Sequence, residues 1–120
     1  MKIAITELKD ASLIAISGRI DSDTSPEVAK AFQTVQDQGQ YNIFVDMAGL
    51  EYISSATLRA LMSAQRASKR HEGEVVLLRV PESILNVLDM AGLVEIYRIV
   101  NDPSTLPELE GVQLAAYPAK

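Results

Sequence analysis

The stretch from residue 42 to residue 62 constrains the fold of this 120-residue chain more than any other. It opens with a continuous apolar run at residues 43–45, which is typical of a strand covered on both faces. We expect Asp46 to end this strand, as a polar residue where the chain leaves the sheet. A helix then follows. Either Ser54 or Ser55 can be its N-cap, because a serine oxygen accepts a hydrogen bond from an unpaired backbone N–H of the first turn.

A hydroxyl group at a helix start has a chemical meaning beyond capping. The free N–H donors and the positive end of the helix dipole stabilise a phosphate group attached there. The same phosphate adds about two negative charges to any surface that a partner protein must cover. Serine is nevertheless a favoured cap in any helix, so the residue types alone favour an ordinary cap.

Three segments of the chain resemble the signature segments of a known family. They are GRIDSDT at residues 18–24, VDMAGLEYISSATLR at residues 45–59 and VLDMAGL at residues 87–93. Together, and in this order, they resemble the STAS domain of the bacterial anti-sigma factor antagonists. The resemblance covers about residues 1–100 and implies an α/β fold with a mixed sheet.

The resemblance also implies a regulatory cycle. The unmodified antagonist binds an anti-sigma factor that is a serine kinase, and this frees the sigma factor. The kinase then uses ATP to phosphorylate the antagonist, and a metal-dependent serine phosphatase restores it. Alignment of the motif places the phosphorylated residue at Ser55, with Ser54 and Thr57 as rival acceptors. Asp21 and Thr24 match the family's loop beside that site.

Two residues depart from the family pattern. Ser54 stands where many of these antagonists have an acidic residue, and Thr57 stands where they usually have glycine. The branched side chain of Thr57 restricts the first helical turn. The predicted partner-binding residues are Asp21, Thr24, Ser54, Ser55, Thr57 and Arg59.

A row of basic residues follows the two serines along the predicted helix. Arg59, Ser63, Arg66 and Arg70 fall at i, i+4, i+7 and i+11, and therefore share one face. A charge run of this kind is usually a solvated face. The alternative is a docking ridge for an acidic surface of the kinase, because interfaces favour complementary charges.

Composition and charge exclude several classes of protein. The length is that of one domain, and the formal net charge of −5 argues against a general nucleic-acid binder. The chain has no cysteine, which excludes disulfides and thiol chemistry. Its amino terminus does not resemble a signal peptide, and no apolar run approaches the roughly 20 residues of a membrane helix. We therefore expect a cytoplasmic protein without membrane insertion.

The hydrophobic pattern predicts alternating strands and helices in the order β-β-α-β-α-β-α-β. We expect an antiparallel hairpin first, then an amphipathic helix that ends near Gly39 and begins with either a Ser25 cap or a Thr24–Glu27 capping box. Further strands are predicted at residues 41–47, 74–80 and 93–100. The STAS domain is expected to span residues 1–100, followed by a C-terminal tail at residues 101–120 that can pack on the domain.

The sequence offers little for catalysis. His71 is the only histidine, so a Ser-His-Asp relay or a histidine metal cluster would depend on that single residue. There is no phosphate-binding loop of the Walker type and no Gly-x-Ser-x-Gly elbow. Asp21 and Asp23 are better explained as a hydrated turn than as a cation site. We predict a protein that is not an enzyme and needs no cofactor or metal.

Two rival functions remain open at this point. STAS-like domains also serve as phosphorylation-independent adaptors in lipid-transport complexes, anion transporters and stress-signalling scaffolds, and Ser55 would then be only a cap. The second rival is a small-ligand or nucleotide binder that uses the helix start as an anion site.

Overall fold

The sheet is mixed and is built around the apolar run identified in the sequence. The structure is a computed structural model and describes residues 1–115. In this part of the chain the strands are hydrogen-bonded in the sequential order β1-β2-β3-β4-β5, with β1 antiparallel to β2 and the other neighbours parallel. Their bounds are β1 Lys2–Glu7, β2 Ser12–Ile20, β3 Asn42–Ile53, β4 Glu74–Leu78 and β5 Arg98–Val100. The predicted element order and mixed sheet are confirmed.

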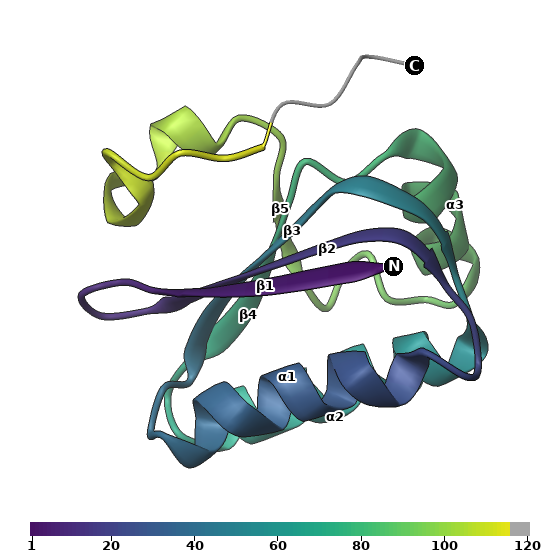
Figure 1. Ribbon diagram of the computed structural model, residues 1–120, viewed down its shortest axis with the longest axis horizontal. Coiled ribbons are helices and arrows are strands. Elements are labelled where there is room, and N and C mark those ends of the chain that lie inside the picture. The colour runs from purple at the N-terminus through teal and green to yellow at the C-terminus, as the bar shows by residue number, and fades with distance from the viewer. Residues whose placement is uncertain (116–120) are drawn as a thin grey trace.

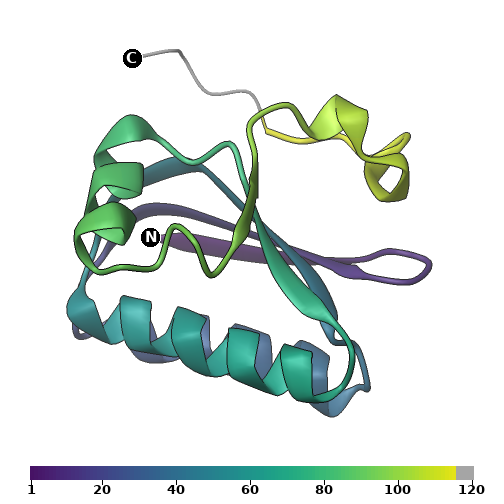
Figure 2. The same cartoon turned by 180° about the vertical axis from the view of Figure 1, so that it is seen from behind.

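Helices α1 and α2 lie side by side on one face of this sheet, and α3 stands at the end of the sheet where β2 and β3 finish (Figures 1 and 2). The helices are α1 Ser25–Asp37, α2 Ser55–Arg70 and α3 Glu82–Met90. Each presents an apolar stripe to the sheet, and the buried side chains of the stripes include Val28, Phe32, Leu61, Ile84 and Leu88. Strand residues Ile43 and Val45 belong to the same core cluster.

The opposite face of the sheet has a smaller core that the C-terminal segment covers (Figure 1). Phe44 and its strand neighbours point to this side, where they contact Leu106 and Leu109. Leu106 lies between two short 3-10 helices, η1 Pro103–Thr105 and η2 Pro107–Leu109, and Leu109 is the last residue of η2. The apolar run at 43–45 is therefore buried on both faces, as predicted. Of the predicted tail, residues 116–120 lie outside the described part of the chain.

The prediction that Asp46 ends the central strand is wrong. β3 continues to Ile53, and Asp46 lies inside it with only 3% of its surface exposed. The buried carboxylate is paired with Arg79 through Nη2–Oδ2 and Nε–Oδ1 distances of 2.6 and 3.1 Å. It also accepts a hydrogen bond from the backbone N–H of Ala48. A charged residue is possible in the strand because these donors replace its water.

Two predicted strands are shorter than expected. β4 ends at Leu78 because Arg79 adopts a left-handed backbone conformation with φ +50°. Residues 93–97 form turns, closed by hydrogen bonds from Leu93 N–H to the Leu88 carbonyl and from Ile96 N–H to the Leu93 carbonyl. Only Arg98–Val100 extends the sheet there.

Neither predicted side-chain cap of the first helix forms. Thr24 occupies the cap position of α1, yet its hydroxyl makes no cap hydrogen bond and contacts Asp21 instead. Proline does lie in the first turn of α1, and the chain leaves the helix through Gly39, which has φ +85°. In α3, Ile84 and Leu88 are buried, whereas Val87 is 36% exposed.

Candidate functional site

The ends of two parallel strands bring the predicted site residues to one edge of the sheet. In the register of β2 and β3, Ile20 lies opposite Ile53, so both strands finish at the same level. The backbone N–H of Ser54 donates a hydrogen bond to the carbonyl of Ile20 at 2.9 Å. This bond joins the chain segments that follow β2 and β3. The loop at residues 21–24 and the start of α2 are therefore neighbours.

Ser54 is the N-cap of α2, and its hydroxyl group is already hydrogen-bonded within the helix. Its side chain accepts a hydrogen bond from the Thr57 N–H at 3.3 Å, and its hydroxyl lies 3.1 Å from the hydroxyl of Thr57. Ser54 is 8% exposed and Thr57 is fully buried. These two hydroxyl groups hold each other beneath the surface, and they stabilise the first turn of the helix.

Ser55 is the first residue of α2, and its side chain is exposed. It thus differs from Ser54 and Thr57, the two nearby hydroxyl residues, which are buried. Its position at the start of a 16-residue helix places it near the positive end of the helix dipole. A negatively charged group attached to Ser55 is stabilised there without entering the core.

Asp21 organises the neighbouring loop. Its Oδ1 accepts hydrogen bonds from the backbone N–H groups of Asp23 and Thr24 and from the Thr24 hydroxyl, at 3.0–3.1 Å. The hydrogen bonds from Thr24 are the main reason why the pKa of the Asp21 carboxyl lies below its ordinary value of 3.8. The loop therefore has a defined conformation next to Ser54, with a carboxylate that stays ionised at neutral pH.

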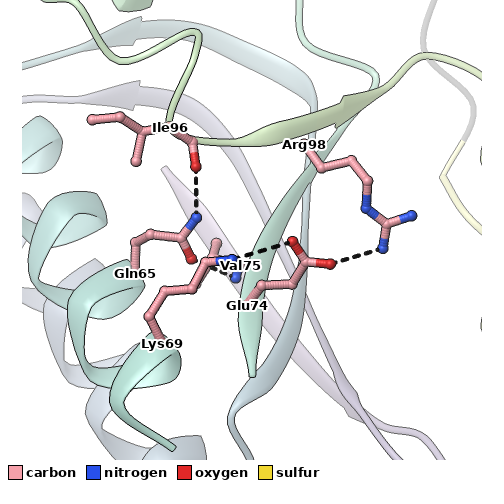
Figure 3. Close-up of polar contacts among 6 residues, drawn as sticks. All are labelled: Gln65, Lys69, Glu74, Val75, Ile96 and Arg98. Carbon is pink, nitrogen blue, oxygen red and sulfur yellow. Dashed lines mark hydrogen bonds and ion pairs between the residues drawn. The ribbon is translucent and has the colours of Figure 1, made fainter. Parts of the chain in front are cut away.

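A buried glutamine fixes α2 relative to the rest of the fold. The Gln65 side chain accepts a hydrogen bond from the Val75 N–H at 2.8 Å and donates one to the carbonyl of Ile96 at 2.9 Å (Figure 3). Beside it, Glu74 is paired with Arg98 and Lys69. These contacts join the second half of α2 to β4 and to the turns before β5.

A family model described as "Mlab, STAS domain" matches residues 3–101. The chain belongs to the STAS domain family. Among curated proteins, BtrV of Bordetella bronchiseptica, provisionally named an anti-sigma factor antagonist, is 23% identical over 101 residues, which are 84% of this chain and 87% of BtrV. The anti-sigma-B factor antagonist of Listeria monocytogenes is 25% identical over 88 residues, which are 73% of this chain and 77% of the relative.

Solved structures of STAS proteins have the same fold. The anti-sigma factor antagonist SpoIIAA in its unphosphorylated form superposes with a TM-score of 0.77 at 14% identity, covering 94% of this chain and all of that one. SpoIIAA of Bacillus in its phosphorylated form gives a TM-score of 0.70 at 15% identity, over 88% of this chain and 96% of that one. At these identities the likeness concerns the fold alone.

In this STAS domain the six predicted site residues occupy one edge of the sheet but differ in accessibility. Asp21, Ser55 and Arg59 are exposed, and Thr24 is half-buried in its loop. Ser54 and Thr57 lie beneath the surface. Within residues 1–115, no group of three or more His, Cys, Asp or Glu side chains is arranged to hold a metal ion. None of the helices in that range has the length and apolar character needed to cross a bilayer.

Sequence reasoning missed one feature beside the STAS site. Arg19 and Tyr52 are opposite each other in the β2–β3 register, and the guanidinium carbon of Arg19 lies 4.5 Å from the centre of the Tyr52 ring. Tyr52 is 41% exposed, so this cation–π pair is at the surface. The two residues are 33 positions apart in the chain, and only the strand register reveals their contact.

Proposed function

We propose that this STAS protein is an anti-sigma factor antagonist whose binding to a serine-kinase anti-sigma factor is controlled by phosphorylation of Ser55. The observation that carries the proposal is the difference between Ser55 and its neighbours. The Ser55 side chain is exposed at the start of α2, whereas Ser54 and Thr57 are buried and bonded to each other. A kinase active site can reach the Ser55 hydroxyl group without unfolding the helix.

The geometry also supports a switch. A phosphate on Ser55 is tolerated within the chain because it lies at the positive end of α2. On a covered interface, however, the same dianion adds like-charge repulsion and a desolvation cost. Each 1.4 kcal/mol of lost binding energy reduces affinity about tenfold, so a cost of a few kcal/mol is enough to release a partner.

The relatives support the class of partner. The chain covers more than three quarters of the curated proteins described above, and their names make them antagonists of anti-sigma factors. A SpoIIAA structure in a phosphorylated form shows that a protein of this fold can carry the modification. Under this proposal the protein has no catalytic activity, acts in the cytoplasm, and is dephosphorylated by a separate serine phosphatase.

The test is intact-mass analysis after incubation with ATP and the candidate anti-sigma factor kinase. The wild type should gain one phosphate, and Ser55→Ala should gain none. Ser54→Ala should still be phosphorylated on Ser55. It should lose about 1 kcal/mol of stability, since it removes the helix cap, and this loss is measurable by urea unfolding. The mass analysis therefore separates the modified serine from the structural one.

A binding measurement completes the test. Ser55→Glu, which adds one charge at the same position, should bind the anti-sigma factor at least about tenfold more weakly than Ser55→Ala. Stable binding of a partner without phosphorylation by any candidate kinase would contradict the proposal and favour a phosphorylation-independent adaptor. Phosphorylation that persists in Ser55→Ala would place the switch at another residue.

A further inference from the structure

The charges of this acidic chain are unevenly distributed between its helices. The net charge is −5, yet residues 52–71 contain no aspartate or glutamate. α2, which lies within that range, carries Arg59, Arg66, Lys69 and Arg70, whereas α3 carries Glu82 and Asp89 without any lysine or arginine. The outer side of α2 is therefore a basic surface on an acidic protein.

Three arginines of α2 form one line, which we call the arginine row: Arg59, Arg66 and Arg70. An α-helix has 3.6 residues per turn, so steps of seven and eleven residues are about two and three whole turns, and the row is about 16 Å long. All three side chains are exposed. Within residues 1–115, none of them takes part in an ion pair.

The neighbouring basic residues behave differently. Lys69 and Arg98 share the carboxylate of Glu74, at 3.9 and 3.1 Å (Figure 3). Arg79 is paired with the buried Asp46. The fold thus uses these other cations to hold its own elements together, while it leaves the arginine row facing solvent.

An exposed apolar residue, Ile96, lies in a turn that is hydrogen-bonded to α2 at the residue before Arg66. The Gln65 side chain donates a hydrogen bond to the carbonyl of Ile96 at 2.9 Å. Ile96 itself is 48% exposed. Burial raises the pKa of Tyr97. Arg66, the next residue along α2 after Gln65, lies near this tyrosine, and its positive charge opposes that rise. Arginine is a residue type that protein interfaces favour over the remaining surface.

We propose that the arginine row is the docking surface for an acidic patch of the anti-sigma factor. This inference rests on the proposed function and identifies the chemistry of the partner's surface. Interfaces pair patches of opposite charge, and such pairs raise the association rate and fix the orientation of the complex. An unpaired basic row on a protein with a net negative charge fits a protein surface that is locally acidic.

The row also explains how one phosphate can weaken a whole interface. Ser55 precedes Arg59 by four residues, which is about one helical turn. A phosphate on Ser55 would place two negative charges at one end of the row, where they neutralise Arg59 and repel an acidic patch on the partner. The modification and the docking surface are thus arranged on the same helix.

The experiment compares two charge-matched double variants in binding to the purified anti-sigma factor. Arg66→Glu/Arg70→Glu changes the row but leaves Ser55 and Arg59 intact. Lys9→Glu/Lys30→Glu makes the same change in net charge at exposed positions outside α2, in the turn between β1 and β2 and in α1. Thermal unfolding of each variant by circular dichroism shows that the fold is retained. Affinity and association rate are measured at about 50 mM and about 500 mM salt, because exposed charges are screened within a few ångströms at the higher concentration.

We expect the row variant to bind at least about tenfold more weakly at low salt, through a slower association rate, and the deficit to shrink at high salt. The control should remain within about threefold of the wild type. Equal losses in both variants, or wild-type affinity of the row variant, would overturn the inference while leaving the proposed function intact. Failure of the wild type to bind any candidate anti-sigma factor would overturn both. Tighter binding to a random-sequence DNA duplex than to the anti-sigma factor would assign the row to nucleic acid instead.

Discussion

Substitution of Asp46 by alanine is the perturbation for which the structure predicts the largest loss of stability at a single polar residue. The carboxylate accepts hydrogen bonds from two nitrogens of Arg79 and from the Ala48 N–H. Asp46 is 3% exposed and Arg79 is 23% exposed. Removing Asp46 would leave a guanidinium group without its partner in a place that water reaches only in part.

Loss of one member of a buried ion pair costs about 3–5 kcal/mol. Because Arg79 is partly exposed, we expect Asp46→Ala to lower the free energy of unfolding by about 3 kcal/mol, at the lower end of this range. In urea unfolding followed by circular dichroism, with a slope of about 1.5 kcal/mol/M, the midpoint should fall by about 2 M. The melting temperature should fall by about 10 °C for a domain of this size.

Glu74→Ala provides the matched control. Glu74 also contacts two cations, Lys69 and Arg98, but it is 33% exposed, and these cations are 59% and 47% exposed. Pairs of this kind contribute about 0–1 kcal/mol because water and salt screen them. If Asp46→Ala costs no more than Glu74→Ala, burial does not strengthen the Asp46–Arg79 pair and the reasoning is refuted.

Two further predictions concern the backbone and the site loop. A Cβ atom on Gly73 would lie 2.2 Å from the Tyr41 carbonyl oxygen, so Gly73→Ala should cost at least about 2 kcal/mol in urea unfolding. Gly39→Ala should cost about 1 kcal/mol, because that site is open and only its φ of +85° is unfavourable; equal costs would contradict the steric argument. In NMR titration the Asp21 carboxyl should have a pKa below 3.8, and Thr24→Ala should raise it by removing one hydrogen bond. Because this pKa is lower in the folded state, the stabilisation from Asp21 is present above the unfolded pKa and is lost as the pH falls through the folded pKa. An unchanged pKa in Thr24→Ala would show that the hydroxyl has no influence on Asp21.

The order of elements was predictable because its signals are local. An apolar run, a serine at a helix start and a glycine beyond a helix end each act within a few residues. The fate of Asp46 was not predictable, because it depends on Arg79, which lies 33 residues later in the chain. The pattern at residues 93–97 is as apolar as a strand, but these residues turn to cover the core instead of extending the sheet.

The candidate site was predictable in position but not in detail. The sequence left Ser54 and Ser55 as equal candidates for the cap, since both are serines at the same helix start. The structure assigns the cap to Ser54 through its hydrogen bond from the Thr57 N–H. The contact of Arg19 with Tyr52 depends on strand register, which a single sequence does not fix in a sheet with a bulge.

The C-terminal segment that covers the second face of the sheet limits where this protein can be truncated. The family match stops at residue 101, whereas Leu106 and Leu109 close the core on that face. Within residues 1–115, the hydrogen bonds of segment 102–112 join only residues of that segment, so apolar contact alone attaches it. A fragment trimmed to the family boundary would present a bare patch around Phe44 to water and would tend to self-associate. Fusions and expression fragments of this protein should therefore keep the chain through residue 114.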